Sequence, residues 1–172
     1  MNQEHSASFR KLKDSLEKLV KHYRVLLDQL RREKDLLTEN AAEELVTLNS
    51  EKEVLLGKIS QTENLRKRQT MELASALKVS EQNPRLMELA SLLPDAEAEK
   101  LRTIHSTLDL LLKRVVEINT VNSRLATSAL KNANGALANI KRALGQSKPT
   151  YERKGRMHQG EDESGHFVKR EV

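Results

Sequence analysis

The chain lacks cysteine and has very few aromatic residues, which limits what it can be. Without cysteine, neither a disulfide framework nor a thiolate metal site is available, and this suits a reducing compartment. Aromatic residues make up 2% of the sequence, so any core is aliphatic and offers little material for the walls of an enzyme pocket. Only 6 Gly and 3 Pro occur in 172 residues, which predicts a helical protein of one domain with little loop.

Long apolar runs are also missing from the sequence. No segment approaches the ~20 consecutive apolar residues of a membrane span, and the first residues lack the apolar segment of a secretory signal. We therefore expect a soluble, cytoplasmic protein without membrane insertion.

Positive charge is concentrated towards the end of the chain. The formal net charge is +5, and residues 113–144 contain six bases against Glu117 alone. In a helix that covers this region, cations near the C-terminal end complement the helix macrodipole, so a structural explanation is sufficient. A nucleic-acid interface would also need stacking aromatics or a known motif, and the sequence contains neither. We therefore expect no nucleic-acid partner.

Three long segments repeat apolar residues at alternating intervals of three and four. They cover residues 9–30, then 45–59 with a continuation at 71–77, and finally 101–129. This spacing is typical of helices that pack along a coiled-coil seam. Between residues 60 and 70 the apolar stripe is lost, and we expect a solvated helix there that runs past the packed region. The pattern predicts an all-α protein, an elongated antiparallel three-helix bundle.

Helix boundaries are marked by asparagine, proline and glycine. Asn40, with Glu43 three residues later, predicts a capping box at the start of the second helix. Pro84 predicts a break and a short connecting helix at 84–93, and Gly145 is placed to end the third long helix. The polar remainder is too poor in apolar residues to fold alone. We therefore expect a flexible N-terminus (1–8), a helical bundle domain (9–145) and a disordered C-terminal tail (146–172).

Groups for catalysis or metal binding do not form a recognisable pattern. The five histidines show no paired spacing on one helical face, and the carboxylates alternate with lysines and arginines as on a solvated helix surface. A glycine-rich phosphate loop with the required spacing is not found either. We expect no enzyme activity, no metal site and no cofactor.

A segment rich in asparagine and alanine, from Ile118 to Ile140, departs from the leucine pattern. It contains five asparagines and Gly135, which are poor helix formers, although the spacing around them stays helical. One asparagine at a seam position, here Asn122, can fix the register of a coiled coil, and alanines can mark close helix packing. The alternative is that this face binds a partner.

The order of these features resembles the FlgN family of flagellar export chaperones. The resemblance covers residues from about 9 to 156 and rests on LVTLNSEKEVLLGKI (45–59), EINTVNSRL (117–125) and TYERKGR (150–156). The most specific elements are Asn119 and Asn122 followed by Leu125, together with Tyr151 and Gly155.

The resemblance implies a cytoplasmic chaperone that binds the C-terminal helices of the hook-filament junction proteins FlgK and FlgL and delivers them to the type III export gate. A helix lying in a groove is the appropriate recognition mode. Small and amide side chains allow close approach of a client and remain compatible with water when the site is empty. The implied client-binding residues are Asn119, Asn122, Leu125, Ala126, Ala129, Asn132, Ala133, Ala136, Leu137 and Ile140. The resemblance also implies that Tyr151 docks on the cytoplasmic domain of the export gate.

Several alternatives remain open. For Asn122, a role in fixing the register of the bundle is as well supported as contact with a client. For the segment 129–140, client contact is favoured, because this segment runs past the length that the other helices can cover. Tyr151 can equally be an incidental residue of the tail. Identical heptads can close within one chain or between two, so a homodimer is compatible with the sequence. The alternative function is an oligomeric coiled-coil adaptor or structural protein without an export client.

Overall fold

The structure, a computed structural model, describes residues 3–79 and 84–145 of the chain. In these ranges 93% of the residues are helical and no strand occurs, which confirms the all-α prediction. The helices are α1 (Gln3–Glu39), α2 (Ala42–Ala76), α3 (Leu86–Ser91) and α4 (Asp95–Gly145). Because α1 begins at Gln3, the residues from 3 to 8, which we expected to be a flexible N-terminus, are helical. The tail from 146 onward lies outside the described residues.

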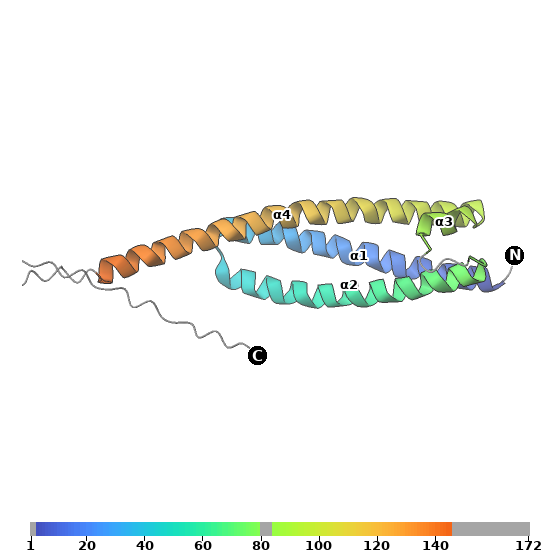
Figure 1. Ribbon diagram of the computed structural model, residues 1–172, viewed down its shortest axis with the longest axis horizontal. Coiled ribbons are helices and arrows are strands. Elements are labelled where there is room, and N and C mark those ends of the chain that lie inside the picture. Colours follow the sequence, from blue (N-terminus) through green and yellow to red (C-terminus); the bar gives the residue numbers. More distant parts are fainter. Residues whose placement is uncertain (1–2, 80–83, 146–172) are drawn as a thin grey trace, which may run out of the picture. The chain divides into compact units, whose positions relative to one another are not determined.

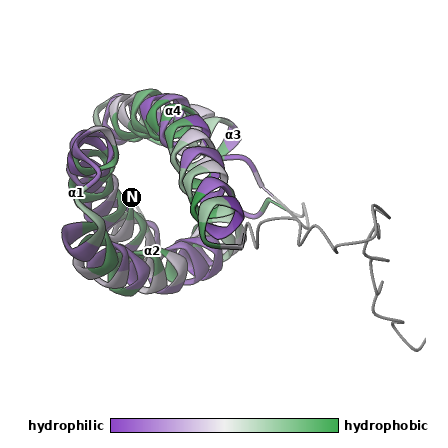
Figure 2. Ribbon diagram, turned by 90° about the vertical axis from the view of Figure 1, so that its left-hand side faces the viewer, coloured by the Kyte–Doolittle hydropathy of each residue, from purple (hydrophilic) through white to green (hydrophobic). Residues whose placement is uncertain are grey.

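The chain divides into two units after Lys131, within the region that we expected to be one domain. The first unit is Met1–Lys131 and the second is Asn132–Val172, so α4 contributes to both. In the first unit, α1 and α2 form an antiparallel hairpin, and α4 runs in the direction of α1 (Figure 1). Seen along the helices, each long helix carries both hydrophobic and hydrophilic residues (Figure 2). These helices and the short α3 agree with the predicted bundle and its connecting helix.

The first hydrophobic cluster joins all four helices. Phe9, Leu12 and Leu16 of α1 pack with Leu73 of α2, and α3 adds Leu89 and its neighbours. At the start of α4, Ala98 and Leu101 complete the cluster. Leu12, Leu73 and Leu89 have no exposed surface at all. The short helix is therefore part of the core, because its apolar side covers the end of the bundle.

The second hydrophobic cluster lies further along the hairpin. It consists of Leu19, Leu26 and Leu30 of α1 with Leu55 and Ile59 of α2. From α4, Leu108, Val115 and Ile118 pack against it and are partly buried. These positions are those of the predicted seams, since a three-four spacing places them on one side of each helix.

The polar stretch of α2 between the two clusters is helical, as expected, but it is packed, so the expectation that it is solvated and runs past the packed region is wrong. Thr62, Gln69 and Thr70 are buried. The hydroxyls of Thr62 and Thr70 donate to the carbonyl oxygens of Lys58 and Arg66, four residues back, each at 2.8 Å. Because these hydroxyls are satisfied within their own helix, threonine can bury its methyl group at an interface.

The capping box predicted at Asn40 is also wrong. Asn40 has φ 56°, and the amide of Ala41 donates to the carbonyl oxygen of Leu36, so Asn40 ends α1 in the left-handed conformation. The α2 helix begins at Ala42 without a side-chain cap on Ala41. Lys78, with φ 60°, ends α2 in the same way. Asparagine suits both ends of a helix, which is why the sequence signal was ambiguous.

Within the described ranges, no helix combines the length and the apolar character that crossing a membrane would require.

Candidate docking surface on helix α4

One side of α4 in the first unit faces the other helices. We call it the bundle seam, and its members are spaced by three or four residues and are all buried or half-buried. They are Leu101, Ile104, Leu108, Leu111, Val115, Ile118, Asn122, Leu125 and Ala129. The predicted seam of the third long helix is therefore confirmed over its whole length. Asn122 is its single asparagine.

Asn122 links all three long helices. Its side chain is 3% exposed, and its Nδ2 donates to the carbonyl oxygen of Leu30 at 2.8 Å and to Oε2 of Glu33 at 2.9 Å. The other oxygen of Glu33, Oε1, accepts from the Lys52 ammonium of α2. Two acceptors on one nitrogen fix the orientation of the amide. This geometry favours the register role for Asn122, because the side chain has little surface left for a partner.

A second stripe on α4 is exposed, and each of its members follows a seam position by one residue. We call the part in the first unit the outer stripe; it consists of Leu112, Val116, Asn119, Ser123, Ala126 and Leu130. Val116 and Leu130 are 64% and 62% exposed. One residue corresponds to about 100° of rotation around an α-helix, so the outer stripe lies beside the seam, on a side of the helix that faces water. An apolar stripe in water is a feature of an interaction surface.

The second unit has an exposed stripe of its own. Ala133, Leu137, Ile140 and Leu144 are again separated by four, three and four residues, and we call them the terminal stripe. All four are exposed; Leu137, Ile140 and Leu144 at 50%, 53% and 82%. Gly135 lies on another side of this helix, and a Cβ added there would meet open space, so packing within the chain gives no reason for a glycine.

The ten residues predicted to bind a client divide between two registers. Asn119, Ala126, Ala133, Leu137 and Ile140 belong to the outer and terminal stripes and are exposed. Asn122, Leu125, Ala129, Asn132 and Ala136 follow the register of the bundle seam. Of this second group, Asn122 is buried, Leu125 and Ala129 are half-buried, and Asn132 and Ala136 are exposed. Tyr151, the predicted contact to the export gate, lies outside the described residues.

Four large apolar residues of the exposed stripes were not among the predicted client-binding residues: Leu112, Val116, Leu130 and Leu144. The signal that identifies them is a second three-four alternation, displaced by one residue from the first.

Open clefts between α1 and α4 form a smaller candidate surface in the first unit. Their apolar floor comes from Val20 and Ile104, and charged residues such as Lys13, Glu17 and Lys100 line the sides. Val20 and Ile104 are half-buried, whereas the large apolar side chains of the outer stripe are exposed. The outer stripe is therefore the stronger candidate for docking a helix.

A cluster of three ionisable groups and one ion pair change the electrostatics of the first unit. Burial raises the pKa of the Tyr23 phenol above 10.0, the Glu63 carboxylate raises it further, and the Arg66 guanidinium partly offsets both. On the surface of α4, Lys113 Nζ lies 2.8 Å from Asp109 Oδ2. This hydrogen bond lowers the pKa of Asp109 and raises that of Lys113. Both groups of this second pair are fully exposed, so it adjusts local charge more than stability.

An exposed apolar stripe on a helical bundle is a surface on which another helix can dock. The family model described as FlgN protein matches residues 1–159, which is most of the chain. The chain therefore belongs to the FlgN family. This is a family of flagellar export chaperones and not of enzymes, so binding of flagellar proteins is the role that membership implies. No curated protein and no solved structure matches the chain.

Proposed function

We propose that the protein is a cytoplasmic chaperone for the hook-filament junction proteins FlgK and FlgL, whose C-terminal helices it holds before export. The observation that carries this proposal is the exposed register of α4, with Val116, Leu130 and Leu137 between 50% and 64% exposed. An amphipathic client helix needs an apolar stripe at i, i+3, i+4 and i+7 spacing, and this side of α4 supplies one.

The composition of the stripe suits a surface that is empty for part of the time. Asn119, Ser123 and Ala126 interrupt the larger apolar residues of the outer stripe. They limit the contiguous apolar area in water, and the amide and hydroxyl can bond to water or to a client. We therefore propose Asn119, Ala126, Ala133, Leu137 and Ile140 as direct client contacts. Asn122, Leu125 and Ala129 support them by holding α4 in register.

Asn132 and Ala136 complete the proposed contact set at its edge. Both are exposed, and both continue the seam register into the second unit, beyond the last half-buried seam residue, Ala129. We further propose that Tyr151 acts in delivery to the cytoplasmic domain of the export gate and not in client binding.

Co-expression with client segments tests the proposal directly. The full-length chain is expected to co-purify with C-terminal segments of FlgK and FlgL from the same bacterium. Ala133→Glu places a carboxylate within the terminal stripe and should abolish this capture. It should change the melting temperature little, because an exposed substitution normally alters stability by no more than about 0.5 kcal/mol.

The matched control is Val54→Glu, since Val54 is 61% exposed on α2 and lies outside both stripes. This variant should keep the client. Capture that survives Ala133→Glu, or that Val54→Glu abolishes equally, would refute the assignment of this side of α4. Tyr151→Ala should retain the client and weaken binding to the gate domain.

The second candidate function is a coiled-coil adaptor that self-associates through the same stripes. Its supporting observation is that heptad-spaced Leu130, Leu137 and Leu144 would also suit a second copy of α4. Light scattering of the client-free chain separates the two functions. A stable dimer that Leu137→Glu dissociates, together with no capture of FlgK or FlgL segments, would favour the adaptor.

A further inference from the structure

The end of α4 is amphipathic as well as exposed. Within the second unit, the terminal stripe places Leu137, Ile140 and Leu144 on one side of the helix. Among the residues that the structure describes, Leu144, at 82%, is the most exposed of the large hydrophobic side chains. Gly135 and Asn139 lie on the opposite, polar side, as expected from a rotation of about 100° per residue.

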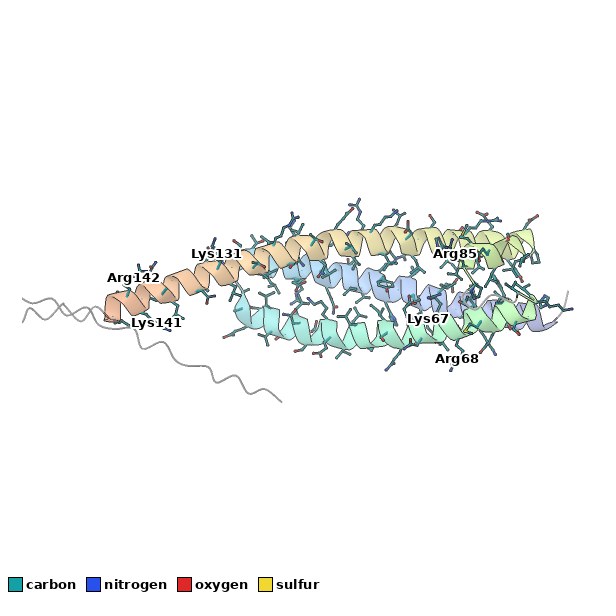
Figure 3. All side chains as sticks on the ribbon, in the orientation of Figure 1. Lys67, Arg68, Arg85, Lys131, Lys141 and Arg142 are labelled. Atoms are coloured by element: carbon teal, nitrogen blue, oxygen red, sulfur yellow. The ribbon has the colours of Figure 1, made fainter. Side chains whose placement is uncertain are left out.

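Positive charge is concentrated around this amphipathic part. The described residues from 118 to 145 contain four bases and no acid. Lys141 and Arg142 are exposed on α4, and Figure 3 labels both of them together with Lys131. Lys141 lies about 40° around the helix from Leu137, at the edge of the terminal stripe, whereas Arg142 lies on the polar side.

A cationic helix with an exposed apolar stripe fits some anionic partners better than others. A nucleic acid would neutralise the bases but would leave the leucines in water, and residues 118–145 contain no aromatic side chain for stacking. The interface of an anionic bilayer takes both features, because acyl chains accept the apolar side and head groups attract the cations.

We propose that, in the client-free chain, the terminal stripe with Lys141 and Arg142 binds the surface of a bilayer containing anionic lipid. The helix lies on the surface, since α4 does not have the apolar character of a membrane span. The proposal rests on the proposed function in one respect. The same stripe is proposed to bind a client, so the chain cannot bind the bilayer and a client through it at the same time. A membrane next to the export gate would then favour release of the client.

Sedimentation with vesicles tests the proposal on the full-length, client-free chain. The chain should bind vesicles of phosphatidylglycerol and phosphatidylcholine, should bind poorly to phosphatidylcholine alone, and should be released by salt. Each cation near an anionic surface contributes about a fivefold factor in partitioning, so Lys141→Gln with Arg142→Gln should weaken binding about thirtyfold. Leu137→Gln with Ile140→Gln should weaken it by about tenfold or more, because two apolar side chains no longer enter the interface.

Two matched pairs on α2 serve as controls. Lys67→Gln with Arg68→Gln removes two adjacent exposed cations, which Figure 3 also labels, and should leave binding within about twofold. Val46→Gln with Val54→Gln removes two residues that are 69% and 61% exposed and should likewise have little effect.

The outcomes separate this inference from the proposed function. The bilayer proposal would be overturned if the chain did not bind vesicles, or bound neutral vesicles as well as anionic ones. It would also be overturned if the α2 double variants lost as much binding as the α4 double variants, or if the chain bound single-stranded RNA in place of vesicles. Capture of FlgK and FlgL segments is measured without lipid, so its failure refutes the chaperone proposal alone. If both hold, adding a client segment should displace the chain from anionic vesicles.

Discussion

Asn122 Nδ2 lies 2.9 Å from Oε2 of Glu33, and the same nitrogen donates to the carbonyl oxygen of Leu30 at 2.8 Å. Because Glu33 is also paired with Lys52, this one amide connects α4 to both helices of the hairpin. A hydrogen bond to a charged group contributes more than one between neutral groups, and the site is buried.

We therefore predict that Asn122→Ala lowers the free energy of unfolding by about 1 to 3 kcal/mol in urea titrations. The substitution removes the hydrogen bonds that Asn122 donates to the Leu30 carbonyl oxygen and to the Glu33 carboxylate. Asn119→Ala is the control, since Asn119 is exposed and should change stability by no more than about 0.5 kcal/mol. Equal effects of the two substitutions would show that the Asn122 network is not structural.

Gln69 gives a second prediction, because it is a buried amide between the two hydrophobic clusters. It is 9% exposed, and its Oε1 has no hydrogen-bond partner among the described residues. Replacing it with leucine removes an unsatisfied polar group and extends the apolar contact, so Gln69→Leu should raise stability by about 1 to 2 kcal/mol. Gln61→Leu, at an exposed position of the same helix, should have little effect. A lower urea midpoint for Gln69→Leu would contradict this prediction.

Lys78 gives a third prediction, since it ends α2 with φ 60°, a conformation that glycine adopts more easily than lysine. Lys78→Gly should therefore raise the free energy of unfolding by about 0.5 to 1 kcal/mol after the larger chain entropy of glycine is taken into account. Asn40→Gly is the comparison: φ is similar at 56°, but asparagine already tolerates this region, so a smaller gain is expected. Thermal melts that rank the two gains in the opposite order would argue against strain at Lys78.

Tyr23 gives a fourth prediction, which concerns alkaline pH. Burial and the Glu63 carboxylate raise the pKa of Tyr23 in the folded state, so the neutral phenol is favoured there. This contribution to stability is fully present below the ordinary pKa of 10.0 and is lost as pH rises through the higher folded pKa. In a Tyr151→Phe background, tyrosinate absorbance reports Tyr23 alone, and its midpoint should lie above 10.0.

Glu63→Gln should move that midpoint down, because it removes the carboxylate and keeps the side-chain size. A midpoint at or below the ordinary value in the folded protein would contradict the burial of Tyr23.

The helices could be predicted because their buried residues recur with a helical period. Leu12, Leu16 and Leu19 illustrate this, since each is buried and each follows the last by three or four residues. The polar part of α2 could not be predicted in the same way, because a threonine such as Thr70 satisfies its hydroxyl within its own helix and then behaves as a small apolar residue. Hydropathy alone does not distinguish this from a solvated threonine.

The candidate site could be predicted only in part, because its residues also depend on packing that the sequence pattern does not show. The sequence drew attention to the correct segment of α4, but it could not separate the two registers within it. The role of Asn122 depends on Leu30 and Glu33, which are about ninety residues away in the chain, so its burial follows from tertiary packing and not from local pattern. Asn119, three residues earlier, has the same chemistry and is exposed.

The displacement of one residue between the seam and the exposed stripes constrains how α4 can change in evolution. A substitution alters one position, but inserting or deleting a single residue after Leu101 would rotate everything that follows by about 100°. A deletion there would turn Val116 and Ala126 towards the hairpin and turn Asn122 towards water, so it would remove every later seam residue from its contacts at once. We therefore expect homologous chains to vary in length at the connections before Asp95 and after Gly145, and to keep the spacing within α4 fixed even where the residues differ.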